Sequence, residues 1–184
     1  MKFSILICSL QKRKCLLRRL INILDPQIDK YKSDIEILTD IDNGKLSIGQ
    51  KRNKLIKKAS GKYIAFIDDD DLVFSNYIDK IMIALESNKD CCGLEGIITT
   101  NGRDPRVFIH SIKYNRWFTK RRIYYRSPNH LNPVKRQIAL KIKFPHINKG
   151  EDRNFSRNIK PLLRTEEYIK GPIYKYLYIK RKKF

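Results

Sequence analysis

The feature that most constrains the fold is a short apolar run that ends in four consecutive aspartates. The run is Tyr63–Ile67, and the aspartates are Asp68–Asp71. A continuous apolar run of this length, bounded by polar residues, is typical of a buried strand in a parallel sheet. Adjacent carboxylates repel one another, so four of them at the end of a strand indicate a bound divalent cation. The alternative is a solvated acidic turn without a ligand.

Magnesium and manganese ions prefer hard oxygen ligands, and one or two carboxylates often hold them together with the phosphates of a substrate. In open α/β sheets, ligands bind outside the carboxyl ends of the strands, which is where the four aspartates are expected. The aspartate run therefore predicts a site for a metal and a phosphorylated ligand.

Strands and helices alternate through the first half of the chain. Apolar runs at 3–9 and 35–39 predict strands, and helical spacing of apolar residues predicts helices at 16–24, 48–59 and 78–85. We expect the first helix to stop at Asp25-Pro26, and Ser47 with Gln50 fits a capping box at the start of the second. This order predicts an α/β fold with a parallel sheet and right-handed crossovers.

The second half of the chain has a different pattern. Residues 96–100 and 107–112 predict a β-hairpin around Asn101-Gly102, with a loop that Asp104-Pro105 lengthens. An amphipathic helix is expected to follow Gly150-Glu151-Asp152, and residues 173–179 predict a late strand or a short helix. We expect one domain over residues 1–184, with two halves at 1–90 and 91–184.

The chain has a formal net charge of +21 over 184 residues. This charge favours an acidic partner, such as nucleic acid, an anionic membrane surface or a phosphorylated ligand. The alternative is that most lysines form solvated faces. No apolar stretch reaches the length of a membrane span, and we interpret residues 3–9 as a strand rather than a signal peptide.

The four cysteines lack the spacing of a zinc site, so we expect free thiols in a reducing compartment, that is, the cytoplasm. The basic residues Lys180–Lys183 leave open a peripheral contact with a membrane surface.

An ordered set of motifs surrounds the aspartates: Gly49, Lys51-Arg52-Asn53, Ala59–Tyr63 and Ile67–Asp71. This set resembles family 2 glycosyltransferases, and Gly150-Glu151-Asp152 resembles the Glu-Asp motif of the same family. The resemblance is strong over residues 1–90, moderate over 144–163 and thin between them. It implies a Rossmann-like GT-A domain that binds a nucleotide-sugar, with UDP-sugar as the expected donor and Mn²⁺ or Mg²⁺ as cofactor. On this resemblance, residues 1–90 form the nucleotide-sugar-binding half and residues 91–184 the acceptor-binding half.

The resemblance also implies roles for individual residues on the donor side. Asp70 is the expected metal ligand, and Asp68 and Asp69 would contact the ribose or support the metal. Asp40 would face the base, and Arg52 would lie near the nucleotide. Ser9 would also lie on the nucleotide side, although Cys8-Ser9 stands where the family usually has a proline.

On the acceptor side, the resemblance implies that Asp152 is the general base of an inverting transfer. Glu151 is the adjacent candidate, and a purely capping role for both residues is the alternative. His130 is the candidate histidine ligand of the metal, with a structural role as the alternative. His146 and Trp117 are candidates for lining the acceptor side.

His110 lies within an apolar strand, and we interpret it as structural. The predicted function is metal-dependent sugar transfer to a hydroxyl of a glycan, lipid or protein. One alternative is a nucleic-acid-binding protein, which the basic and aromatic residues 116–126 favour. Another is a catalytically inactive subunit with the glycosyltransferase fold.

Overall fold

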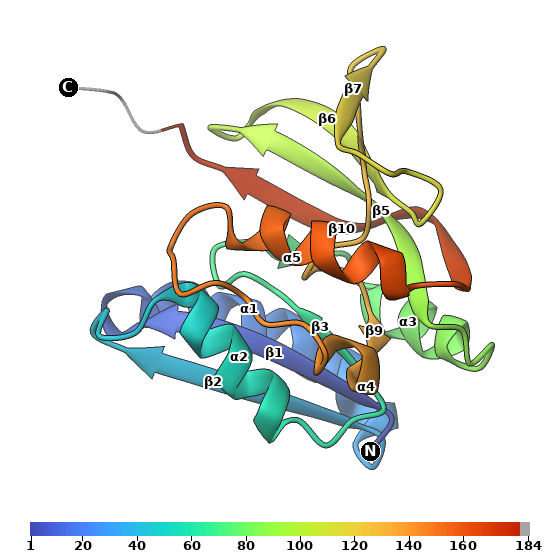
Figure 1. The fold of residues 1–184 in the computed structure, drawn as a ribbon. Coiled ribbons are helices and arrows are strands. Elements are labelled where there is room, and N and C mark those ends of the chain that lie inside the picture. Colours follow the sequence, from blue (N-terminus) through green and yellow to red (C-terminus); the bar gives the residue numbers. More distant parts are fainter. Residues whose placement is uncertain (181–184) are drawn as a thin grey trace.

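The structure, a computed structural model, describes residues 1–180. Figure 1 shows a mixed α/β molecule with a sheet flanked by helices. The strands are β1 (Phe3–Leu10), β2 (Ile35–Asp42), β3 (Tyr63–Phe66), β4 (Leu72–Val73), β5 (Cys91–Thr100), β6 (Arg103–His110), β7 (Phe118–Lys120), β8 (Ile123–Arg126), β9 (Val134–Lys135) and β10 (Glu166–Tyr178). The helices are α1 (Lys14–Ile28), α2 (Ile48–Lys58), α3 (Tyr77–Leu85), α4 (Arg136–Ala139) and α5 (Glu151–Ile159), with 3-10 turns η1 (Gln11–Arg13), η2 (Asp29–Tyr31) and η3 (Lys160–Leu162).

The first half forms the predicted parallel sheet. Strand β1 lies between β2 and β3 and runs parallel to both. The sheet continues in the order β2-β1-β3-β9-β5-β6-β8-β7, and β10 runs parallel to β5 and antiparallel to β4. The predicted α/β fold with a mostly parallel central sheet is therefore confirmed, and antiparallel strands are added at its far end.

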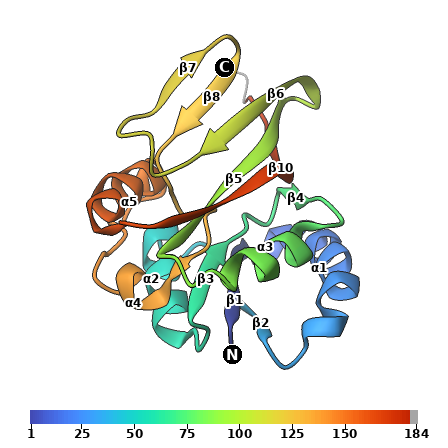
Figure 2. The ribbon, with the colours of Figure 1, turned by 90° about the vertical axis from the view of Figure 1, so that its right-hand side faces the viewer.

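Helices cover both faces of this sheet, because β1 directs alternate apolar side chains to opposite sides. Ile5 and Ile7 pack with α1 and α3 in one cluster of buried side chains. Leu6 packs with α2, α4 and α5 in a second cluster. Figure 2 shows α1 and α3 on one side of the strands and α2, α4 and α5 on the other. Among the described residues, no helix is long and apolar enough to cross a membrane.

Three predictions about individual elements had different outcomes. The capping box at the start of α2 is confirmed, with Ser47 and Gln50 exchanging both hydrogen bonds. The stop at Asp25-Pro26 was wrong, because α1 continues to Ile28 with Pro26 inside it. The side chain of Gln27, the residue after the proline, donates a hydrogen bond to the carbonyl of Ile23 at 2.9 Å.

The predicted hairpin is confirmed, but its loop is shorter than expected. Asn101 and Gly102 both have positive φ angles and form the two-residue turn between β5 and β6. Asp104 and Pro105 lie inside β6, where the register shifts, instead of lengthening the loop. Residues 173–179 are mostly strand: β10 extends from Glu166 to Tyr178.

Candidate functional site

The four aspartates follow β3 at the carboxyl end of the parallel strands, and their surroundings differ. Asp69 and Asp71 are buried, whereas the side chain of Asp70 is 47% exposed. Asp71 accepts hydrogen bonds from the hydroxyl of Tyr174 and the backbone N–H of Leu177, both at 2.8 Å. Burial raises the pKa of Asp71 well above its usual range. Asp71 therefore ties β10 to the end of β3.

Asp69 and Asp70 share a single cation from their own chain. The guanidinium of Arg13 lies 2.6 Å from Oδ1 of Asp69 and 2.6 Å from Oδ2 of Asp70. The hydroxyl of Ser9 donates a hydrogen bond to Asp69 at 2.6 Å. Arg13, at the end of η1, thus offsets the repulsion between the two carboxylates.

Asp68 belongs to a buried charge network around Arg52. Nη2 of Arg52 donates to Asp68 and Nη1 donates to Glu151, each at 2.9 Å. Nε2 of His130 lies 3.3 Å from the other carboxylate oxygen of Asp68. Burial opposes ionisation of Asp68, but the charges of His130 and Arg52 outweigh it and hold the pKa of Asp68 well below its usual range.

Two adjoining cavities lie at this edge of the sheet. One, of about 470 Å³, is lined by the four aspartates together with Ser9, Arg13 and Lys51. The other, of about 270 Å³, is lined by Asp152 together with Arg52, Arg126 and His130. Both cavities are lined by Ile48, Asp68, Asn148 and Tyr176. Asp70 and Asp152 therefore lie in neighbouring parts of one cleft.

Glu151 and Asp152 have different surroundings at the start of α5. Glu151 is buried and paired with Arg52, whereas Asp152 is partly exposed and lines the smaller cavity. Oδ1 of Asp152 accepts a hydrogen bond from the backbone N–H of Arg153 at 2.7 Å. The N-cap is Gly150, whose φ of 80° is left-handed and which has no side chain to cap the helix. Of the two carboxylates, Asp152 is the one without a cationic partner within the described chain.

Other predicted residues lie around this cleft rather than in it. Asp40 is buried at the end of β2 and pairs with Lys54 at 2.8 Å, and it lines neither cavity. His146 is exposed in the loop before α5 and also lines neither cavity. Trp117 donates a hydrogen bond from Nε1 to Ser156 at 3.3 Å and lines a third cavity, together with Arg153 and Arg157 of α5.

Sequence reasoning missed several residues of the cleft. Tyr176 lines both cavities, and only its alternation with Tyr174 and Tyr178 signalled its position. The ammonium of Lys51 donates to the carbonyl of Ser9 at 2.6 Å, and its place in the Lys51-Arg52-Asn53 motif was the available signal.

His110, predicted as structural, is fully buried and also lines the smaller cavity. Its Nδ1 lies 3.0 Å from Oδ1 of Asn132, and burial lowers the pKa of His110 to about 3. The ring is therefore neutral, and since Oδ1 is an acceptor, Nδ1 carries the proton.

The carboxylates suit a divalent ion only in combination with a substrate. Within residues 1–180, no three histidine, cysteine or acidic side chains gather into a group that could hold a metal. However, Mg²⁺ is commonly bound by one or two carboxylates plus substrate phosphates, and Asp70 offers an accessible carboxylate at the wall of the larger cavity. The guanidinium that bridges Asp69 and Asp70 shows that this position stabilises positive charge. The donor set fits a metal that arrives with a phosphorylated ligand.

A known protein family matches most of this sequence. The sequence profile of glycosyl transferase family 2 matches residues 24–144, well over half of the chain. A search of the curated proteins found no match.

Three similar solved structures are of TarS from S. aureus. TarS 1-349 in complex with UDP has a TM-score of 0.70 at 15% identity, covering 96% of this chain and 60% of that chain. TarS 1-349 in complex with UDP-GlcNAc has a TM-score of 0.65 at 16% identity, covering 100% of this chain and 60% of that one. A further TarS structure has a TM-score of 0.67 at 12% identity, covering 96% and 37%. This chain thus spans at most 60% of the length of these proteins, and it belongs to glycosyl transferase family 2, with the GT-A fold of its structural neighbours.

Proposed function

We propose that this chain transfers a sugar from a nucleotide-diphosphate donor, a UDP-sugar, to an acceptor hydroxyl with inversion at the anomeric carbon. The observation that carries the proposal is the pair of adjoining cavities, one lined by Asp68–Asp71 and the other by Asp152. The structural neighbours were solved with UDP and UDP-GlcNAc, which supports a uridine donor.

In this proposal the larger cavity holds the nucleotide diphosphate. Asp70 would hold a divalent metal, with Asp68 or Asp69 and His130 as the further candidate ligands. A bound Mn²⁺ or Mg²⁺ would supply Lewis-acid stabilisation of the departing diphosphate. Arg13 and Lys51 add positive charge to the wall of the same cavity, where it favours an anionic ligand.

The smaller cavity would hold the acceptor, with Asp152 as its general base. Since Glu151 is committed to the buried Arg52, Asp152 is the carboxylate free to accept a proton. It would take the proton of the acceptor hydroxyl as the oxygen attacks the anomeric carbon from the side opposite the diphosphate. Such a base contributes about 10²- to 10⁴-fold to the rate.

The test combines donor binding with turnover. We would titrate UDP-GlcNAc by calorimetry with and without Mn²⁺, and follow UDP release in Asp70→Asn, Asp152→Asn and the exposed control Asp25→Asn. Asp152→Asn should bind donor like the wild type but release UDP at least about 10²-fold more slowly. Asp70→Asn should lose the Mn²⁺-dependent part of donor binding, and Asp25→Asn should match the wild type.

Three results would overturn the proposal. Unchanged UDP release in Asp152→Asn would exclude it as the base, and unchanged Mn²⁺ dependence in Asp70→Asn would exclude it as a metal ligand. Donor binding without any turnover by the wild type would identify an inactive binding subunit.

A further inference from the structure

We propose that the third cavity, lined by α5, η3 and the segment before β7, binds a phosphate group of the acceptor. The acceptor would then be a phosphorylated glycan, anchored here while one of its hydroxyls reaches Asp152. This inference rests on the proposed function and extends it from an unspecified acceptor to an anionic one.

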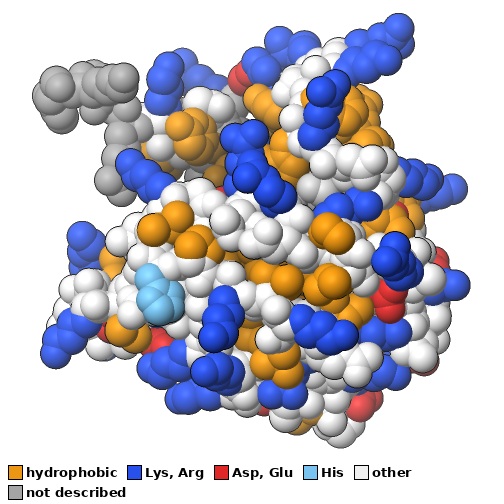
Figure 3. All heavy atoms as spheres, in the orientation of Figure 1, with side chains coloured by type: hydrophobic (Ala, Val, Ile, Leu, Met, Phe, Trp, Pro, Cys, Tyr) orange, Lys and Arg blue, Asp and Glu red, His pale blue; other side chains and the backbone are white. Residues whose placement is uncertain are grey.

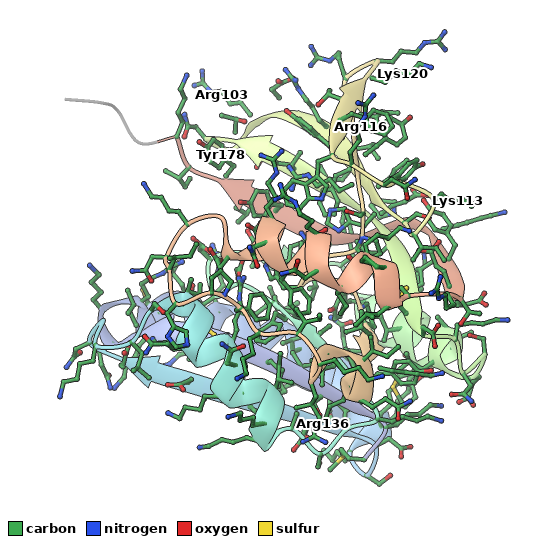
Figure 4. The ribbon with its side chains drawn as sticks, viewed as in Figure 1. Arg103, Lys113, Arg116, Lys120, Arg136 and Tyr178 are labelled. Carbon is green, nitrogen blue, oxygen red and sulfur yellow. The ribbon has the colours of Figure 1, made fainter. Side chains whose placement is uncertain are left out.

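The cavity, of about 370 Å³, is lined by cationic side chains from two separate parts of the chain. Arg153 and Arg157 come from α5 and Lys160 from η3, at spacings that place them on one face. Arg116, labelled in Figure 4, comes from the segment that leads into β7. None of the described residues that line the cavity is acidic, so the charge of its wall is positive.

These cations form no ion pair within the part of the chain that the structure describes. No ion pair between residues 1 and 180 involves Arg116, Arg153, Arg157 or Lys160. The carboxylate of Glu166, which the charge of Lys160 reaches, is bonded to the hydroxyl of Ser111 and the N–H of Ile112. Asp152, the residue before Arg153, lines the reaction cleft instead. A concave site lined by one sign of charge concentrates oppositely charged ligands. Arginine in particular matches phosphate through paired N–H donors.

Consecutive residues line this cavity and the reaction cleft at two places in the chain. Asp152 lines the cleft and Arg153 lines the cationic cavity; Arg126 lines the cleft and Ser127 the cationic cavity. Trp117, which also lines the cationic cavity, stacks on the guanidinium of Arg126 at 4.6 Å. Since consecutive Cα atoms are about 3.8 Å apart, the two cavities are neighbours, and in this proposal one acceptor molecule occupies both.

The shape of the site favours a phosphorylated glycan over two other polyanions. A membrane surface is flat and meets protruding side chains, whereas these four cations line a concavity. A nucleic acid strand needs a groove with several aromatic platforms for its bases, and the one aromatic side chain among the lining residues is Trp117. Its indole suits one sugar ring beside the phosphate.

The experiment compares pentamannose 6-phosphate with its dephosphorylated form, using the full chain with UDP and Mn²⁺ present at 150 mM NaCl. We expect the wild type to bind the phosphorylated probe at least about tenfold more tightly. The double variant R153Q/R157Q should lose this preference. The control K57Q/K58Q removes the same charge from two exposed lysines at the end of α2 and should keep it.

Equal affinity of the wild type for both probes, or an unchanged preference in R153Q/R157Q, would overturn the proposal. The proposal would also fail if the wild type bound a 12-nucleotide single strand, or vesicles containing phosphatidylserine, more tightly than the phosphorylated probe and R153Q/R157Q abolished that binding.

UDP binding is measured in the same samples by calorimetry. If UDP binds while the phosphorylated probe shows no preference, the acceptor inference fails and the donor site stands; if UDP itself does not bind, the proposed function fails. Thermal unfolding of each variant confirms that it is folded.

Discussion

At the scale of single residues, Arg52 holds the two parts of the cleft together. Its side chain is 2% exposed and pairs with Asp68 after β3 and with Glu151 on α5. It also lies over the rings of Phe66 and Phe144 at 5.5 and 5.3 Å. A buried charge pair contributes little relative to an apolar replacement, but removing one partner leaves an uncompensated charge.

We therefore expect Arg52→Ala to destabilise the protein by about 3–5 kcal/mol. The measurement is urea unfolding followed by circular dichroism. Lys57→Ala, at an exposed position of the same helix, is the control and should change the free energy of unfolding by less than about 0.5 kcal/mol. An Arg52→Ala protein with the wild-type midpoint would show that the network contributes no stability.

Asp42 gives a prediction about pH. Burial opposes its ionisation, but the hydrogen bond from Lys51 and those from two backbone N–H groups outweigh it and lower the pKa of Asp42 to about 2. Because the folded-state pKa lies below the usual 3.8, the stabilisation is fully present above about pH 4 and is lost as the pH falls towards 2.

We expect the difference in unfolding free energy between the wild type and Asp42→Asn to be constant from pH 7 to 5 and to shrink between pH 4 and 2. Thermal unfolding across this pH series measures it, with the exposed Asp25→Asn as the control for general charge effects. A difference that grows as the pH falls would contradict the assignment.

At the scale of elements, Gly49 of α2 lies directly against the loop before α5, with no room for a side chain. A Cβ at this position would lie 1.9 Å from the carbonyl oxygen of Pro145. The N–H of Gly49 lies 3.4 Å from the carbonyl of Ile147, and Asn53 exchanges two hydrogen bonds of 2.9 Å with the backbone of Phe144. This contact positions the loop that leads to Glu151 and Asp152.

Gly49→Ala should destabilise the protein by about 1–3 kcal/mol, because the loop must move to admit the methyl group. The same shift should slow UDP release by displacing Asp152, whereas Lys57→Ala on the same helix should leave both properties unchanged. Urea unfolding and UDP release measure the two effects. If the alanine variant were as stable and as active as the wild type, the loop would be able to move aside without loss of unfolding free energy or of activity, and the prediction would be wrong.

At the scale of the whole molecule, positive charge dominates. Figure 3 shows Lys and Arg side chains distributed over the visible face, with few acidic side chains among them. With a formal net charge of +21, self-repulsion opposes the compact state, and salt screens it with a Debye length of about 10 Å at 0.1 M.

We therefore expect the melting temperature to rise when NaCl increases from 20 to 300 mM, and sulfate to raise it further. Differential scanning calorimetry measures this change. A fall in melting temperature over the same range would show that the surface ion pairs, such as Lys30–Asp79 at 2.6 Å, outweigh the net repulsion.

The alternation of strands and helices, the capping box at Ser47 and the strand that ends in aspartates were readable from the sequence, because each depends on neighbours a few residues apart. The family motifs also implied that Asp70 and Asp152 share a cleft. Asp70 follows a parallel strand at the edge of the sheet where ligands bind, whereas Asp152 begins α5, so its place was predicted from the resemblance alone.

The sequence by itself determined this order of elements and the place of the aspartates at the end of β3. Only the tertiary structure decided which aspartate is buried and which is accessible. Asp71 accepts hydrogen bonds from Tyr174 and Leu177, which are 103 and 106 residues away, whereas Asp70 remains accessible. The tertiary structure alone also determined the pairing of Glu151 with Arg52 and the cationic cavity beside α5. Such contacts join distant segments, and their partners are chosen by packing rather than by local preference.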